Sequence, residues 1–281
     1  MFELPDYLRV PPHDLGCDSS VDVTIVDGMV ELAEAMAEAM LEVISQAAAE
    51  DRAATLIVPV GPVDQFPILA EKINERKVDC TGVMFINMDE YLTEEDEWVP
   101  LDHPLSFRGF MNRKFYDRID RALVPAPECR VFPDPRSPES IEAAIAERGG
   151  VDACFGGIGI NGHVAFNEPP EPGESITLGA FAELPTRTLD LSRETRTINS
   201  VTVGGDITII PRRAITVGMK EILASRRILL YCNRPWQSAV VRRVLHGPIE
   251  PACPASLIRQ HGDAALTMAR YVADLPQIEL R

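Results

Sequence analysis

The chain has 281 residues, of which 46% are hydrophobic and 25% charged, and its formal net charge is −16 at pH 7. This composition is that of an ordinary globular protein and excludes the disordered and fibrous classes. The negative charge disfavours nucleic acid and anionic lipid as partners, and an anionic substrate would need arginine or lysine placed locally.

The predicted strands, in chain order, cover residues 21–25, 55–60, 82–86, 151–155, 214–217, 227–231 and 264–269. The predicted helices cover residues 28–49, 65–76, 105–120 and 137–148, and a helix follows each of the strands at 214–217 and 227–231. Strands thus alternate with helices, and no repeat or linker interrupts the pattern. This predicts an α/β fold with a mainly parallel sheet covered by helices on both faces, in a single domain, 1–281.

The cysteines and the N-terminal residues predict where the protein works. The six cysteines include no Cys-x-x-Cys pair, which argues against a zinc or redox motif and favours reduced thiols. The first 18 residues are polar and lack the apolar core of a signal peptide, and no segment reaches the roughly 18–20 apolar residues that span a bilayer. We therefore expect a soluble, cytoplasmic protein that does not bind a membrane.

A polar segment follows the predicted strand at 82–86. Residues 87–91, with the sequence NMDEY, are expected to form a loop that places Asp89 and Glu90 side by side where a parallel strand ends. Ligands of open parallel sheets bind at this end of the strands. A purely structural interpretation also stands, in which Asp89 caps the next segment and Glu90 is solvated.

A denser polar segment, with the sequence GGIGINGHVAFNE, covers residues 156–168. Its glycines allow backbone amides to approach a ligand closely. His163 precedes Glu168 by five residues, and an imidazole oriented by a carboxylate is the usual general acid/base near neutral pH. A tight turn with a locally bonded histidine would explain His163 but not Asn161, Asn167 and Glu168 around it. Residues 168–179, rich in Pro, Glu and Gly, are expected to form a mobile surface loop.

Several catalytic motifs are missing from the sequence. It contains no Gly-x-x-x-x-Gly-Lys-Ser/Thr phosphate loop, no His-Glu-x-x-His zinc motif and no Gly-x-Ser-x-Gly nucleophile elbow. The glycines at 156–159 lack the Gly-x-Gly-x-x-Gly spacing of dinucleotide-binding loops. A serine hydrolase and a nicotinamide enzyme are therefore disfavoured.

The segments 87–91, 157–169 and 214–219 resemble the glucosamine-6-phosphate deaminase/isomerase family in order and spacing, over about residues 55–261. The Phe-Asn-Glu-Pro sequence at 166–169 favours the deaminase branch over the related 6-phosphogluconolactonases. The resemblance implies that Asp89 moves a proton between C2 and C1 of an open-chain amino sugar. It implies that His163, oriented by Glu168, promotes ring opening. Asn161 stands where the family has Asp or Asn.

The reaction that the resemblance implies is isomerisation of a 2-amino-aldose to a ketose with loss of ammonia, and it requires no metal or organic cofactor. The expected partner is a small-molecule sugar. The sequence does not decide whether the protein forms a homo-oligomer.

The sequence departs from the family where the family binds phosphate, namely in a Thr/Ser-Gly-Gly-Thr loop, an arginine after Asn-Ser, and a lysine in a late helix. Here the loop reads VGPVD at residues 60–64, Val201 follows the Asn-Ser pair, and Gln237 occupies the lysine position. A shift of alignment could bring in Arg234 or Arg212, but it would not replace all three. We therefore expect a substrate without the usual 6-phosphate. The candidate substrate-binding residues are Gly61, Asp64, Gln65, Glu90 and Gln237.

Two other functions remain open. The first is a lactonase-like hydrolase on the same fold, in which His163 would activate water and Asp89 would not be needed. The second is a catalytically inactive sugar-binding or regulatory homologue. The joint presence of Asp89, His163 and Glu168 argues against this second alternative, because decay should not spare only the proton-transfer groups.

Overall fold

The main sheet contains seven strands, all paired in parallel, in the order β1-β10-β9-β6-β2-β3-β5. The computed structural model describes residues 3–62 and 64–279, so Val63 of the VGPVD loop lies outside the described residues. The strands are β1 Val21–Val26, β2 Thr55–Val58, β3 Met84–Asn87, β5 Arg130–Val131, β6 Ala153–Gly156, β9 Ile228–Cys232 and β10 Ala264–Ala269. Every residue of β2, β3, β6 and β9 is buried, as expected for strands covered on both faces.

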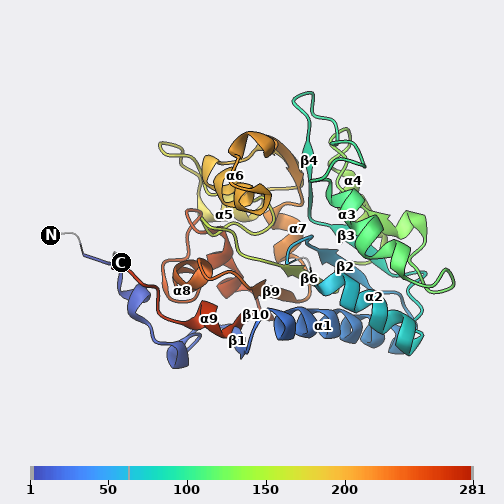
Figure 1. Ribbon diagram of the computed structural model, residues 1–281, viewed down its shortest axis with the longest axis horizontal. Coiled ribbons are helices and arrows are strands. Elements are labelled where there is room, and N and C mark those ends of the chain that lie inside the picture. Colours follow the sequence, from blue (N-terminus) through green and yellow to red (C-terminus); the bar gives the residue numbers. More distant parts are fainter. Residues whose placement is uncertain (1–2, 63, 280–281) are drawn as a thin grey trace.

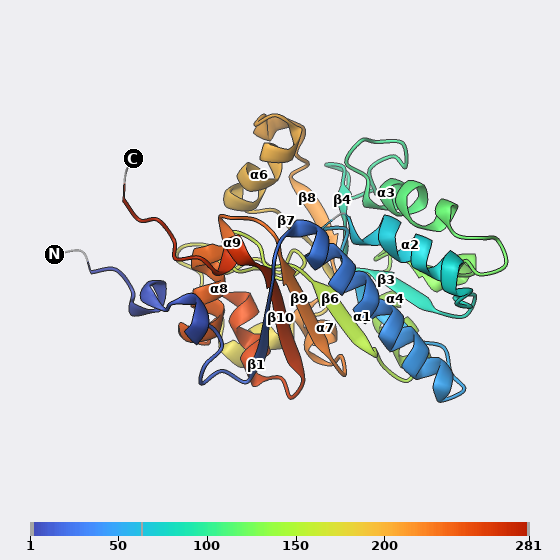
Figure 2. The same cartoon turned by 60° about the horizontal axis from the view of Figure 1, so that its bottom comes forward.

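Helices cover the two faces of this sheet. The helices are α1 Met29–Ala49, α2 Gln65–Arg76, α3 Phe107–Lys114, α4 Ser140–Glu147, α5 Leu178–Ala182, α6 Arg193–Ser200, α7 Met219–Leu223, α8 Gln237–His246 and α9 Arg270–Ala273. In Figure 1, α1 runs below the sheet and α7 lies above it. Figure 2 shows α1 crossing the near face. The predicted α/β class and mainly parallel sheet are confirmed. None of the helices within the described ranges is long and apolar enough to cross a membrane.

A second sheet of three antiparallel strands was not predicted. It contains β4 Asp89–Leu92, β8 Arg213–Thr216 and β7 Arg187–Asp190, in the order β4-β8-β7. The chain leaves the main sheet at Asn87 and enters the second sheet at Asp89, so the prediction of a loop at 87–91 is wrong. The strand predicted at 214–217 exists but belongs to this second sheet. Four buried residues in β4 explain both corrections, because a buried segment needs backbone partners, which β8 provides.

Other differences from the prediction have local causes. The helix predicted at 105–120 begins only at Phe107, because the Ser106 side chain accepts a hydrogen bond from Gly109 N and caps it there. It ends at Lys114 and is followed by a 3₁₀ turn, Tyr116–Arg118. Strands β5 and β7 and helix α6 were not predicted, since β5 has two residues and α6 carries almost no apolar side chains to mark its periodicity.

Candidate active site

A cavity of about 360 Å³ lies at the carboxyl ends of the central strands of the main sheet. The segments that line it follow four strands: Pro59 to Pro62 after β2, Met88 and Asp89 after β3, Gly157 to Gly159 after β6, and Asn233 and Arg234 after β9. Tyr91, Phe107 and Phe166, whose rings pack together, form an apolar wall. The cavity therefore has the size and position of a small-molecule site in an open α/β sheet.

The Asp89 carboxyl lines this cavity from the first position of β4 and is 8% exposed. Burial, followed by the charge of neighbouring Glu90, raises its pKa to about 8. In the described part of the chain, no hydrogen bond engages this carboxyl. A carboxyl with such a pKa is present in both protonation states near neutral pH, so it can accept and return a proton.

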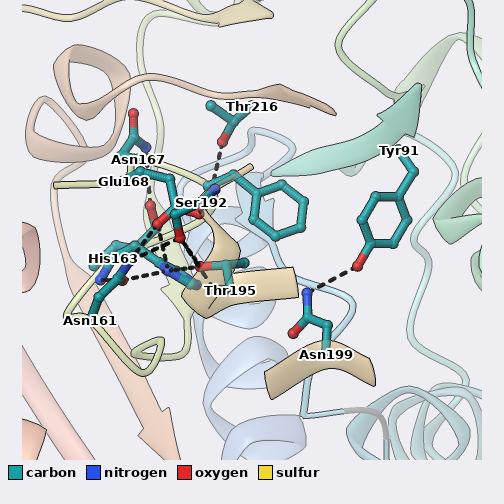
Figure 3. A network of polar contacts seen from close by, with 11 residues as sticks. Tyr91, Asn161, His163, Asn167, Glu168, Ser192, Thr195, Asn199 and Thr216 are labelled. Atoms are coloured by element: carbon teal, nitrogen blue, oxygen red, sulfur yellow. Dashed lines mark hydrogen bonds and ion pairs between the residues drawn. The ribbon is translucent and has the colours of Figure 1, made fainter. Parts of the chain in front are cut away.

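The His163 imidazole lines the cavity from the segment that follows β6, and three side chains surround its Nδ1 atom (Figure 3). Nδ1 lies 2.8 Å from Asn161 Oδ1, 3.2 Å from Thr195 Oγ1 and 3.4 Å from Glu168 Oε2. Among residues 3–62 and 64–279, no hydrogen bond involves Nε2. A proton on Nδ1 therefore has acceptors nearby, and Nε2 remains available for proton transfer.

The Glu168 carboxylate is the anionic member of this group. Its burial opposes ionisation, but the hydrogen bond and charge of His163, with hydrogen bonds from Asn161 and Thr195, outweigh burial and hold its pKa at about 2. Asn161 Nδ2 donates to Glu168 Oε2 at 2.6 Å, and Ser192 N donates to Oε1 at 3.3 Å. Glu168 thus stays ionised at any working pH and places a negative charge 3.4 Å from Nδ1 of His163.

Gly159 makes room for the imidazole ring. A Cβ atom at this position would lie 2.1 Å from Cε1 and Nε2 of His163, far inside van der Waals contact. The adjacent turn needs a second glycine, Gly162, whose φ is +90° and whose missing Cβ would lie 2.8 Å from Cys253 Sγ. The glycines were predicted to admit a ligand, and these two are required by the histidine and the turn.

Asn167 fastens the same segment to the second sheet. It is fully buried, and its Nδ2 donates to the carbonyl oxygens of Val164 and Val217 while its Oδ1 accepts from Arg187. Nearby, Phe166 N donates to Thr216 Oγ1 at 3.0 Å. These bonds fix the position of the segment that follows β6, which carries His163 and Glu168.

Helix α6 contacts residues of the site at both of its ends, which was not predicted from the sequence. Ser192, its N-cap, and buried Thr195 contact Asn161, Glu168 and His163 at one end. At the other end, Asn199 Nδ2 donates to Tyr91 Oη at 3.0 Å, and both residues line the cavity (Figure 3). The helix-start signal of Ser192 was the available clue to α6.

Glu90 does not have its predicted place. It is fully buried and is absent from the cavity wall. Its carboxylate accepts hydrogen bonds from Ser106 Oγ and from the backbone N–H groups of Tyr91, Phe107 and Arg108, and it also pairs with the Arg108 side chain. The prediction that Glu90 contacts substrate is therefore not supported, because its acceptor capacity is spent on the start of α3.

The other predicted substrate-binding residues divide into two groups. Gly61 and Gln237 line the cavity, but Gln237 uses Nε2 for Ile158 O and Oε1 for Arg234 N, each at 2.7 Å. Asp64 is exposed and Gln65 is buried, and neither belongs to the cavity wall. Asn233 was not predicted, and Arg234 was considered only through a shift of alignment. No cluster of three metal-ligating side chains occurs in the described ranges.

Comparison with known proteins places the chain among its relatives. It is 31% identical to a glucosamine-6-phosphate deaminase of Rhodopirellula baltica over 218 residues, covering 76% of this chain and 80% of the relative. The chain belongs to the glucosamine-6-phosphate deaminase family. A Caenorhabditis elegans member is 28% identical over 87% of this chain and 86% of its own length. No family model matches the sequence.

Solved structures agree with the family assignment. A monomeric glucosamine-6-phosphate deaminase superposes with a TM-score of 0.76 and 26% identity, covering 91% of this chain and all of the other. A 6-phosphogluconolactonase from Trypanosoma cruzi, at 17% identity and a TM-score of 0.64, shares the fold. The predicted enzyme class, an amino-sugar deaminase/isomerase-like protein, is confirmed by the relatives.

Proposed function

We propose that this protein converts a 2-amino-aldose without a distal phosphate to the corresponding ketose, with release of ammonia. The observation that carries the reaction type is the joint position of Asp89 and His163 on one small cavity, with ionised Glu168 behind the imidazole. Family membership supports the same reaction type.

The residues divide the proton transfers between them. His163, through Nε2, delivers a proton to the ring oxygen of the bound sugar as the C1–O bond breaks. The C1 hydroxyl loses its proton to water, and the ring opens to an aldehyde. Glu168 and Asn161 hold Nδ1 and stabilise the imidazolium from which that proton comes. An oriented acid of this kind contributes roughly 10²–10⁴-fold to the rate.

Asp89 then acts on the open chain. Its carboxylate takes the proton from C2, and the aldehyde oxygen takes up a proton from water, which gives an enol. Asp89 then returns its proton to C1, which leaves a protonated imine at C2. Water adds to this imine and ammonia leaves, so one water is consumed and one ammonium is released for each ketose formed. A pKa of about 8 suits both directions of transfer.

The cavity wall supports the absence of a phosphate. Arg234 is the only arginine or lysine among the lining residues that the structure describes, and it is exposed. Pro62 has no amide proton to offer, and Val201 is 68% exposed and does not line the cavity. A phosphate dianion would therefore meet too few charge-assisted donors to balance its desolvation.

The test is ammonia release from a panel of amino sugars, namely glucosamine, galactosamine, mannosamine and glucosamine 6-phosphate. We expect turnover of an unphosphorylated sugar, poor turnover of the phosphate, and loss of ammonia release in Asp89→Asn and His163→Gln. Asp22→Asn, an exposed change on edge strand β1, is the matched control and should retain activity.

Each alternative gives a different result in the same panel. Efficient turnover of glucosamine 6-phosphate would overturn the substrate proposal and leave the reaction intact. Hydrolysis of 6-phosphogluconolactone that survives Asp89→Asn would show a lactonase. Thermal stabilisation by sugars without turnover of any would show a binding protein.

A further inference from the structure

Two adjacent polar side chains, Asn233 and Arg234, line the cavity directly after β9. Asn233 is 7% exposed, yet no hydrogen bond engages its side-chain amide within residues 3–62 and 64–279. The Arg234 guanidinium likewise has no ion pair or hydrogen bond in these ranges. The amide of Asn233 is not among the buried unpartnered groups of the described residues, so it is open to the cavity that Asn233 lines and can bind a polar group of a ligand.

The backbone that presents these two side chains is held from both sides. Tyr271 Oη donates to Asn233 O at 2.6 Å, and Arg234 N donates to Gln237 Oε1 at 2.7 Å. Gln237 in turn donates to Ile158 O, which joins this turn to the segment after β6. The two side chains are therefore offered by a fixed turn, which is the property expected of a specificity site.

The groups at this turn match a ligand that carries one negative charge. The turn provides one guanidinium, one carboxamide and the N-terminus of α8, which begins at Gln237 and favours an anion. A carboxylate matches a guanidinium in a two-bond geometry and can accept a further bond from the Asn233 amide. A dianion would find no second arginine or lysine on the described cavity wall.

The turn also lies at the far end of the cavity from Asp89. The strand order β9-β6-β2-β3 places two strands between them, or roughly 14 Å at about 4.8 Å per interval, before the side chains reach inward. Asp89 acts at C1 and C2 in the proposed function. The group that meets Asn233 and Arg234 is therefore the distal end of the sugar chain.

We infer that Asn233 and Arg234 form a distal subsite for a carboxylate, so that the preferred substrate is a 2-amino-2-deoxyuronate. The inference rests on the proposed function and names its substrate class. The aminouronate and one water give a ketouronate and one ammonium, and the carboxylate passes through the reaction unchanged. Reactions that supply free aminouronates, namely hydrolysis of both the glycosidic bond and the N-acyl bond of N-acylated aminouronosides, would precede this enzyme.

The experiment compares kcat/KM for 2-amino-2-deoxyglucuronate, glucosamine and glucosamine 6-phosphate in the wild type and in Arg234→Gln, Arg234→Lys and Asn233→Ala. We expect the uronate to be preferred over glucosamine by about tenfold or more. Arg234→Gln should lower kcat/KM for the uronate roughly 10- to 100-fold, mainly through KM, the effect of losing one charge-assisted pair. Glucosamine should change less than about threefold, and Arg234→Lys should be intermediate.

Arg121→Gln is the matched control, because Arg121 is exposed and does not line the cavity. Binding of the uronate to Asp89→Asn, measured by calorimetry with and without Arg234→Gln, separates recognition from turnover. The uronate could bind in a way that depends on Arg234 and yet not be turned over by the wild type. That result would support the carboxylate subsite and contradict the proposed function.

Three outcomes would overturn the inference while ammonia release from glucosamine upholds the proposed reaction. The first is a uronate turned over no better than glucosamine. The second is an Arg234→Gln effect equal for charged and neutral sugars. The third is a preference for glucosamine 6-phosphate that depends on Arg234, which would make this a phosphate subsite.

Discussion

The Thr195 hydroxyl lies 3.2 Å from Nδ1 of His163, and this contact joins helix α6 to the segment that follows β6. Thr195 is fully buried, and its hydroxyl also accepts a hydrogen bond from Ser192 Oγ. The orientation of the imidazole thus depends on a helix remote in sequence as well as on its own neighbours Asn161 and Glu168.

Replacing Thr195 tests this dependence. Thr195→Val keeps the shape but removes the hydroxyl, so we expect kcat for ammonia release to fall about 3- to 10-fold, the value of one neutral hydrogen bond, with KM little changed. Thr195→Ser restores the hydroxyl and should recover most of the rate. If serine is as poor as valine, packing rather than the hydroxyl positions His163.

The raised pKa of Asp89 predicts how activity depends on pH. Because C2 deprotonation requires the carboxylate, kcat/KM should rise with pH up to about 8, where Asp89 is half ionised. Glu168, with a pKa of about 2, contributes no step in this range. The measurement is kcat/KM for ammonia release from pH 5.5 to 9.5. A rate that is flat across this range would show that Asp89 is not the base.

The same shift predicts an effect on stability. Native Asp89 keeps its proton up to about pH 8, whereas in the unfolded chain the carboxyl ionises near the ordinary aspartate pKa of 3.8. The native state therefore binds more protons between these values, and its stability falls as pH rises through this window. Asp89→Asn removes this loss. The free energy of unfolding of the variant minus that of the wild type should therefore increase from pH 4.5 to pH 9. Urea unfolding at both values measures the difference, and an equal difference at both would contradict the burial of an uncompensated carboxyl.

The contact between Gly159 and His163 predicts a large effect of one methyl group. Gly159→Ala would place Cβ on the imidazole and displace the ring, so we expect activity to fall by roughly 10²-fold, as for a misplacement of about 1 Å. Gly179→Ala is the control, because no atom lies within 4 Å of its added Cβ. Equal activity of the two variants would show that the ring can move without cost.

Glu90 should matter for folding and not directly for substrate. Glu90→Ala leaves three backbone donors and Arg108 without their buried acceptor, so we expect a stability loss on the order of 3–5 kcal/mol. Chemical denaturation measures this loss. A variant of unchanged stability that no longer binds sugar would restore the role predicted from the sequence.

The elements that were predicted correctly are those whose pattern is local. Buried strands such as β2 and β6 are short apolar runs, and α1 carries apolar residues at helical spacing. The position of His163 next to Asn161 and Glu168 follows from a few residues of spacing and was also anticipated.

What was missed depends on contacts between distant segments. Nothing near Asp89 in the sequence shows that it pairs with Thr216 in a second sheet. The polar helix α6 has no apolar stripe to announce it, and its contacts with His163 cross about 30 residues. Glu90 looked functional because it is an acid at a strand end, and only the donors around it reveal its structural use.

The separation of Asp89 and His163 from Asn233 and Arg234 has a consequence for how such a protein can change. The proton-transfer groups follow β3 and β6. The segment after β6 tolerates little change, because a side chain at Gly159 would collide with the His163 ring. The turn after β9 follows another strand, and the Gln237–Ile158 hydrogen bond joins it to the segment after β6. Substitutions in that turn can therefore alter which sugar enters while the proton chemistry stays the same, so new substrates are open to this fold without a new mechanism.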